Sequence, residues 1–188
     1  MSIVFGFAPF IAFFVMLRLV SPLAGLAAAL VVSALLSLRM WRRGETVKVL
    51  EIGSLALFAT LSLYTLVAMP AWTIATVRLA VDAGLLAIVL VSLVIGQPFT
   101  LQYARERVPQ ALWTSPFFLH ANRAITAVWA LAFAILAGAD AAAEYLPAIP
   151  LWAEIAASVA ALLGALWFTS WYPQRLRRRA GALQAGAR

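Results

Sequence analysis

Four ionisable residues lie within or at the edge of apolar segments, where charged side chains are rare and often functional. Arg78 and Asp82 are four residues apart, so a helix would place them on one face. Arg18 lies near the end of the first apolar segment, and Glu154 lies one turn into the last. Two cations and two anions could meet there and neutralise each other. The sequence therefore offers a candidate intramembrane polar cluster of Arg18, Arg78, Asp82 and Glu154.

The same four residues also fit a purely structural interpretation. Arg18 and Arg78 could extend their charged ends to the membrane surface while their stems stay in apolar surroundings. Asp82 would then be an internal ion-pair partner of Arg78. A carboxylate such as Glu154 is favoured near a helix N-terminus by the helix dipole. Both interpretations remain open from the sequence alone.

No other group of residues predicts catalytic, cofactor-binding or metal-binding chemistry. Asp140 and Glu144 provide two carboxylates, too few for a calcium site, and we expect them in a solvated loop. The chain has one histidine, His120, and no cysteine, so bis-histidine haem ligation within one chain and cysteine-ligated clusters are excluded. Serine-hydrolase, phosphate-loop and zinc-protease motifs are absent. We therefore expect a protein that is not an enzyme.

The composition requires a lipid environment for most of the surface. The 188 residues are 65% hydrophobic and 11% charged, with a mean hydropathy of +0.97. Soluble domains are typically about 45–50% apolar and about 25% charged. The net charge of +7 does not indicate nucleic acid binding, because the cations lie at the ends of apolar segments and in a tail. Anionic lipid headgroups are the expected partners of these cations.

The hydropathy pattern predicts an all-α, polytopic membrane bundle of about six transmembrane helices. We expect one transmembrane domain over residues 1–174 and a basic cytoplasmic tail over 175–188. The first two segments are short, so they are either two spans in a tight hairpin or a re-entrant pair. The expected spans cover residues 3–20, 23–38, 49–69, 77–95, 124–139 and 151–171.

The longest polar connection, residues 97–123, mixes cations with aromatic side chains. This mixture is typical of a segment that lies at the membrane interface. Together with the basic tail, it supplies candidate contacts to lipid or to a partner protein. These candidates are Arg105, Arg107, Trp113, His120, Arg123, Arg175, Arg177, Arg178 and Arg179.

The cations also predict an orientation. Of the 14 Lys and Arg residues, all except Arg18 and Arg78 fall in alternate gaps between apolar segments or in the tail. Cationic loops resist translocation and stay cytoplasmic. We therefore expect both termini in the cytoplasm of a bacterial cell, with a multi-pass chain in the cytoplasmic (inner) membrane.

Several local strings resemble the bacterial intracellular septation protein A family. They are Phe7-Ala8-Pro9-Phe10 followed by Phe13-Phe14, the break at Gly96-Gln97-Pro98-Phe99, and Trp129-Ala130-Leu131-Ala132-Phe133 with the turn that follows it. The chain departs from the family at Thr126, in a region where the family tends to have Asn. The resemblance implies a non-enzymatic inner-membrane protein that supports cell division and the cell envelope.

Three functions remain open from the sequence. The first is a scaffold protein of the envelope or division machinery, which would contact other membrane proteins. The second is a small oligomeric transporter or channel with a polar site at Arg18, Arg78 and Asp82. The third is an accessory subunit of a larger membrane complex, with faces of small residues that dock on other helices.

Overall fold

The computed structural model describes residues 6–146 and 149–185, and within these ranges every regular element is a helix. The side chains of residue 151 and of residues 177–185 lie outside this description. The expected all-α fold is therefore confirmed for the described residues. The elements are α2 (Ala8–Leu19), α3 (Pro22–Arg42), α4 (Val49–Ala68), α5 (Ile74–Val94), α6 (Phe99–Arg105), the 3₁₀ helix η1 (Gln110–Leu112), α7 (Pro116–Tyr145) and α8 (Leu151–Ala185).

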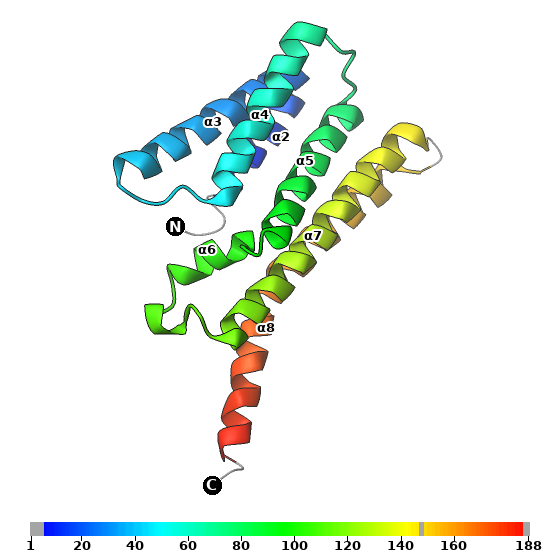
Figure 1. Ribbon diagram of the computed structural model, residues 1–188. Coiled ribbons are helices and arrows are strands. Elements are labelled where there is room, and N and C mark those ends of the chain that lie inside the picture. Colours follow the sequence, from blue (N-terminus) through cyan, green and yellow to red (C-terminus); the bar gives the residue numbers. More distant parts are fainter. Residues whose placement is uncertain (1–5, 147–148, 186–188) are drawn as a thin grey trace.

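The helices pack mostly in chain order. α2 packs on α3, α3 on α4, and α4 on α5. The short α6 crosses one end of the bundle, and α7 then packs between α5 and α8 (Figure 1). This arrangement brings the start of α5, the end of α7 and the start of α8 to one end of the molecule. The start of α4, α6 and η1 lie toward the other end (Figure 1).

Five of the described helices are long and apolar enough to cross a membrane. They are α3, α4, α5, α7 and residues Trp152–Leu176 of α8. α2 has 12 residues, so it extends about 18 Å, whereas a bilayer core is about 30 Å thick. The expected first span, 3–20, began at residues that lie outside the described ranges.

Local sequence signals explain where several helices begin and end. The Ser21 side chain accepts a hydrogen bond from the Ala24 amide at the start of α3, and Ser115 accepts one from Phe118 at the start of α7. A proline follows each of these serines and suits the first helical turn. α5 ends at Val94, and Gly96 in the turn that follows has a φ of 76°, which a glycine reaches easily.

Two described helices extend beyond the expected membrane spans. The fifth span was expected over 124–139, but α7 begins at Pro116, so the last part of the expected interfacial segment 97–123 is helical. The reason is the cap at Ser115, after which no helix breaker occurs. The last span was expected to end before Pro173, yet α8 continues through that proline to Ala185. The Leu, Arg, Ala and Gln residues that follow are strong helix formers, and they outweigh the single lost hydrogen bond.

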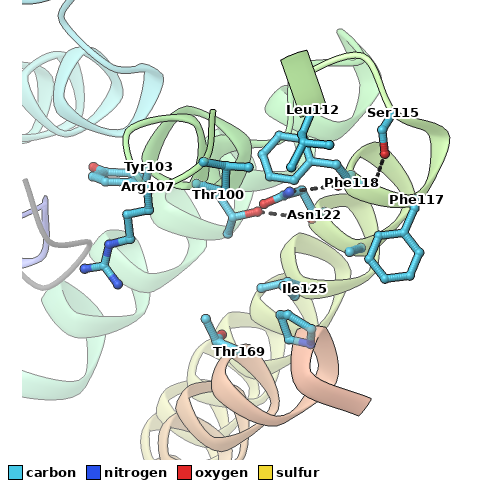
Figure 2. A pocket seen from close by; sticks show the side chains of 14 residues that line it. Thr100, Tyr103, Arg107, Leu112, Ser115, Phe117, Phe118, Asn122, Ile125 and Thr169 are labelled. Carbon is cyan, nitrogen blue, oxygen red and sulfur yellow. Dashed lines mark hydrogen bonds between the residues drawn. The ribbon is translucent and has the colours of Figure 1, made fainter. Parts of the chain in front are cut away.

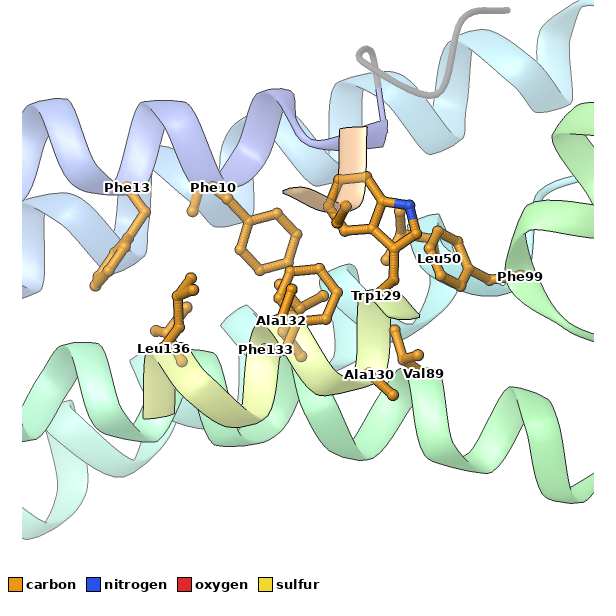
Figure 3. Close-up of a cluster of buried hydrophobic side chains, with 14 of the residues drawn as sticks. Phe10, Phe13, Leu50, Val89, Phe99, Trp129, Ala130, Ala132, Phe133 and Leu136 are labelled. Carbon is orange, nitrogen blue, oxygen red and sulfur yellow. The ribbon is translucent and has the colours of Figure 1, made fainter. Parts of the chain in front are cut away.

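Aromatic side chains fill the centre of the bundle. Phe10 and Phe13 of α2 contact Phe58 of α4, with ring centroids 5.2 and 6.0 Å apart. Trp129 and Phe133 of α7 lie beside each other, with centroids 5.5 Å apart, in the same cluster (Figure 3). Ring pairs of this kind stabilise a core beyond their buried area. The result is an apolar layer between the two ends of the bundle.

Candidate functional site

One end of the bundle holds four ionisable side chains, which we call the Arg78 cluster: Arg78, Asp82, Asp140 and Glu154. α5 contributes Arg78 in its second turn and Asp82 one turn later, α7 contributes Asp140 near its end, and α8 contributes Glu154 in its first turn. The start of α5 is fixed by a capping box between Thr73 and Thr76. The capping box thus fixes where Arg78 and Asp82 lie along α5, and the packing of α7 and α8 brings Asp140 and Glu154 to them.

Arg78 is the centre of the cluster. Its Nη2 lies 2.5 Å from Asp140 Oδ1, and its Nη1 lies 2.5 Å from Glu154 Oε1. Asp82 is close enough to Asp140 and Arg78 to interact electrostatically with both. One guanidinium therefore joins α5 to both α7 and α8.

The cluster is buried and its formal charges do not balance. Asp82 is 2% exposed, Asp140 0% and Glu154 4%, while the Arg78 side chain is 12% exposed. Three ionised carboxylates beside one cation would leave an excess of negative charge in an apolar environment, which is energetically costly. Neighbouring carboxyl groups avoid this cost by keeping a proton between them. The arrangement can therefore store protons.

A metal ion is not the counter-charge that the geometry favours. Within the described ranges, no group of three or more His, Asp or Glu side chains has the geometry of a metal site. The Arg78 guanidinium occupies the position between Asp140 and Glu154 that a cation would take. Among the described residues, Arg78 is therefore the cation that contacts these carboxylates.

The structure brings together three of the four residues of the sequence-derived cluster. Arg78, Asp82 and Glu154 meet, but Arg18 is exposed and has no ion pair among the described residues. Arg18 lies in the last turn of α2, which ends at Leu19. Phe14 of the same helix contacts the cluster instead, with the centre of its ring 6.0 Å from the Arg78 guanidinium.

Sequence reasoning missed Asp140, which was expected in a solvated loop and is instead fully buried. A signal for this position exists. Asp140 follows Leu136, Phe133 and Trp129 by four, seven and eleven residues, which is the spacing of one helix face. Its neighbour Glu144 accepts a hydrogen bond of 2.6 Å from the Thr73 hydroxyl, at the surface of the same end.

A second buried ionic group, the Lys48 cluster, lies beside α6 and consists of Lys48, Glu51, Tyr103 and Glu106. Lys48 Nζ lies 2.7 Å from Glu106 Oε1 and 4.7 Å from the centre of the Tyr103 ring. The Tyr103 hydroxyl donates a hydrogen bond of 2.8 Å to Glu51 Oε1. Burial and the adjacent Glu51 raise the pKa of Tyr103, so its hydroxyl remains a donor. These contacts fix α6 against the start of α4.

A pocket of about 390 Å³ lies on the same side of the molecule as α6 (Figure 2). Its walls combine a polar group, which includes Thr100 and Asn122, with aromatic and aliphatic side chains. Thr100 Oγ1 lies 2.7 Å from Thr126 Oγ1 and donates to the Asn122 carbonyl over 3.1 Å, so this wall is held rigidly. We call it the α6–α8 pocket; its lining is Thr100, Tyr103, Ala104, Arg107, Val108, Leu112, Ser115, Phe117, Phe118, Ala121, Asn122, Ile125, Thr169 and Pro173.

The candidate lipid or partner contacts occupy several elements around this pocket. Arg105 lies over the Trp113 ring at 5.4 Å, and Arg175 lies over the Trp171 ring at 4.8 Å. His120 and Arg123 are exposed on the first turns of α7. The side chains of Arg177, Arg178 and Arg179 lie outside the described part of the chain.

Comparisons with known proteins identify no relative of this chain. No family model matches it, and neither a curated protein nor a solved structure is similar. The resemblance to the septation protein A family therefore rests on the local sequence strings alone.

Proposed function

We propose that this chain is a small membrane transporter in which the Arg78 cluster binds and releases protons. The observation that carries the proposal is the burial of three carboxyl groups around one arginine. Ionisable residues between membrane helices commonly form proton relays. A cluster with more acids than bases can change its proton content without any change in backbone fold.

The apolar layer favours a transporter over an open channel. Along α7, the buried face from Trp129 to Leu136 separates Asp140 from Thr126, a distance of about 21 Å along the helix. Water and protons do not cross such a layer unless it rearranges. Transport would therefore require movement of α7 against α5 and α2, which contribute to the same core.

Proton flux into liposomes tests the proposal. Purified protein is reconstituted with an internal pH-sensitive dye, and a potassium diffusion potential is imposed with valinomycin. We expect flux above that of protein-free liposomes, reduced at least tenfold by Asp82→Asn and by Asp140→Asn. Glu144→Gln is the matched control, because Glu144 is one turn from Asp140 but outside the cluster. Flux equal to that of empty liposomes, or unchanged in both Asn variants, overturns the proposal.

Infrared spectroscopy provides an independent measurement on the same variants. A carboxyl group that holds a proton absorbs at a different frequency from a carboxylate. We expect one protonated carboxyl band at neutral pH that is lost in Asp82→Asn or Asp140→Asn and retained in Glu144→Gln. If the wild-type protein shows no protonated carboxyl band, proton storage is contradicted. This outcome does not depend on how well the variants fold.

The proposal includes a location and an orientation. We place the chain in a bacterial cytoplasmic membrane with both ends inside, with α2 as a sixth, short membrane segment. The chain has no cysteine, so single cysteines can be introduced directly. A membrane-impermeant maleimide should label Ala71→Cys in intact cells and should leave Glu45→Cys unlabelled. The reverse pattern would contradict the orientation.

A second candidate function is a scaffold of the envelope or division machinery, as the septation-family resemblance implies, or an accessory subunit of a membrane complex. One observation favours it: the Lys48 cluster holds α6 rigidly while η1 and the start of α7 expose Leu112 and Phe117. Cross-linking in intact membranes from Leu112 and Phe117 should recover one defined membrane protein. Recovery of lipid alone would contradict this second function.

A further inference from the structure

The α6–α8 pocket presents two kinds of chemistry at its two sides. Arg107 lies at one edge (Figure 2), and its side chain makes no ion pair or hydrogen bond within the described part of the chain. Phe117, Phe118 and Ile125 of α7 line the opposite wall, with Leu112 of η1 nearby. A ligand that fits both sides has an anionic group joined to an apolar chain.

The rim of the pocket is open to the surroundings. Leu112 is 50% exposed and Phe117 43% exposed, so apolar side chains continue from the pocket onto the outer surface. Other cations lie near this region: Arg105 over Trp113, and Arg123 on the exposed side of α7. No acidic side chain lines the pocket. The local charge therefore favours an anion and disfavours a cationic ligand.

The depth of the pocket matches a membrane interface. α8 carries stacked aromatic pairs at this level, Trp167 on Trp171 at 4.9 Å and Phe168 on Tyr172 at 4.8 Å. Trp and Tyr side chains collect where lipid headgroups meet the acyl chains. Thr169 and Pro173, which line the pocket, belong to the same stretch of α8. A lipid would thus meet the pocket at the height of its headgroup.

We propose that the α6–α8 pocket binds one anionic phospholipid, with its phosphate beside Arg107 and the upper part of one acyl chain against Phe117, Phe118 and Ile125. The volume of about 390 Å³ lies within the range of about 300–1,000 Å³ that is usual for ligand sites. The guanidinium of Arg107 supplies paired donors for phosphate oxygens. This site is separate from the Arg78 cluster, and the inference does not depend on transport.

Native mass spectrometry of the full chain in detergent tests the inference, with phosphatidylglycerol and phosphatidylcholine as probes. We expect one phosphatidylglycerol to remain bound and phosphatidylcholine to bind at least tenfold more weakly. Arg107→Gln should lower phosphatidylglycerol binding about tenfold or more, since charged hydrogen bonds contribute strongly. Arg123→Gln removes a charge from the same region outside the pocket, and it should change binding less than about twofold. Equal losses in the two variants would overturn the inference.

A second pair of variants tests the pocket itself. Ala104→Phe places a ring in the pocket from the rigid α6, whereas Ala111→Phe places one on the exposed side of η1. We expect the first to abolish phosphatidylglycerol binding and the second to leave it intact, with melting temperatures as the check on folding. Retained binding in Ala104→Phe would overturn the inference.

Two further probes separate a phospholipid from other anions. Inorganic phosphate should not displace phosphatidylglycerol at comparable concentration, because it lacks the acyl chain. Palmitate should bind more weakly than phosphatidylglycerol, because it lacks the phosphate. Displacement by phosphate alone, or binding of palmitate without binding of phosphatidylglycerol, would each overturn the assignment.

Discussion

The two buried ionic clusters, at opposite ends of the bundle, use similar residues in different balance. In the Arg78 cluster, one cation faces three carboxyl groups, all of them almost completely buried. In the Lys48 cluster, Lys48 pairs with Glu106, whose side chain is 35% exposed, and Glu51 binds the neutral hydroxyl of Tyr103. The second cluster thus gives each charge a partner or access to water. This charge imbalance under burial is the difference on which the proposed proton exchange at the Arg78 cluster rests.

Removal of Arg78 should have the largest effect on stability. Arg78→Gln leaves Asp140 and Glu154 without their cation, and breaking a buried pair costs about 3–5 kcal/mol. Unfolding in mixed micelles, followed by circular dichroism, measures the loss. Arg18→Gln is the matched control and should change the free energy of unfolding by less than about 0.5 kcal/mol, because Arg18 is exposed. Equal losses of unfolding free energy in Arg78→Gln and Arg18→Gln would show that the Arg78 ion pairs do not stabilise the fold.

In the Lys48 cluster, at the other end of the bundle, removal of the Tyr103 hydroxyl should have an intermediate effect on the free energy of unfolding. Tyr103→Phe leaves Glu51 Oε1 without its donor, which should cost about 1–3 kcal/mol in the same unfolding assay. We expect no change in proton flux, because the Lys48 cluster is a structural contact. If Tyr103→Phe kept normal stability but lost proton flux, the Lys48 cluster would take part in transport and would not be a structural contact alone.

Removal of the Glu106 carboxylate should change the free energy of unfolding least, and this change should depend on pH. Partial burial opposes ionisation of Glu106, but stronger effects, among them the hydrogen bond and the charge of Lys48, hold the pKa of Glu106 below its ordinary value of 4.5. A lowered pKa in the folded state stabilises the protein above about pH 4.5. This contribution is lost as the pH falls through the folded-state pKa. We expect a difference of at most about 1 kcal/mol between wild type and Glu106→Gln at neutral pH, given the exposure of Glu106.

Unfolding curves between pH 3 and pH 7 measure this difference. The two proteins should converge toward the acidic limit, where Glu106 is protonated and resembles glutamine. A difference that grows toward low pH would contradict the assigned direction of the pKa change.

The sequence predicted the helices well because the hydropathy pattern acts locally along the chain. It predicted the meeting of Arg78, Asp82 and Glu154 less securely, since their approach depends on how α5, α7 and α8 pack. Asp140 was missed because its neighbours are alanines, Ala139 and Ala141, which do not distinguish a buried helix face from an exposed one. Its spacing from Leu136 and Phe133 nevertheless follows the buried face. Of the two interpretations of Arg18, its exposure at the end of α2 fits the one in which its charged end extends out of the apolar region.

The same reasoning explains why two helices extend beyond the expected spans. Pro116 starts α7, and Pro173 lies within α8. A proline suits the first turn of a helix, and within a helix its cost can be offset by the residues around it. The α6–α8 pocket was not predicted, because it forms between segments far apart in the sequence.

The apolar layer of Phe10, Phe58, Trp129 and Phe133 has an electrical consequence. In a membrane, voltage falls mainly across material of low dielectric constant, whereas water and ionic groups carry little of the drop. The layer would therefore concentrate the field between Asp140 and Thr126. A single charge that crosses the full membrane voltage gains or loses about 2.3 kcal/mol per 100 mV. Even one proton that passes this layer would therefore make the protein sensitive to the membrane voltage.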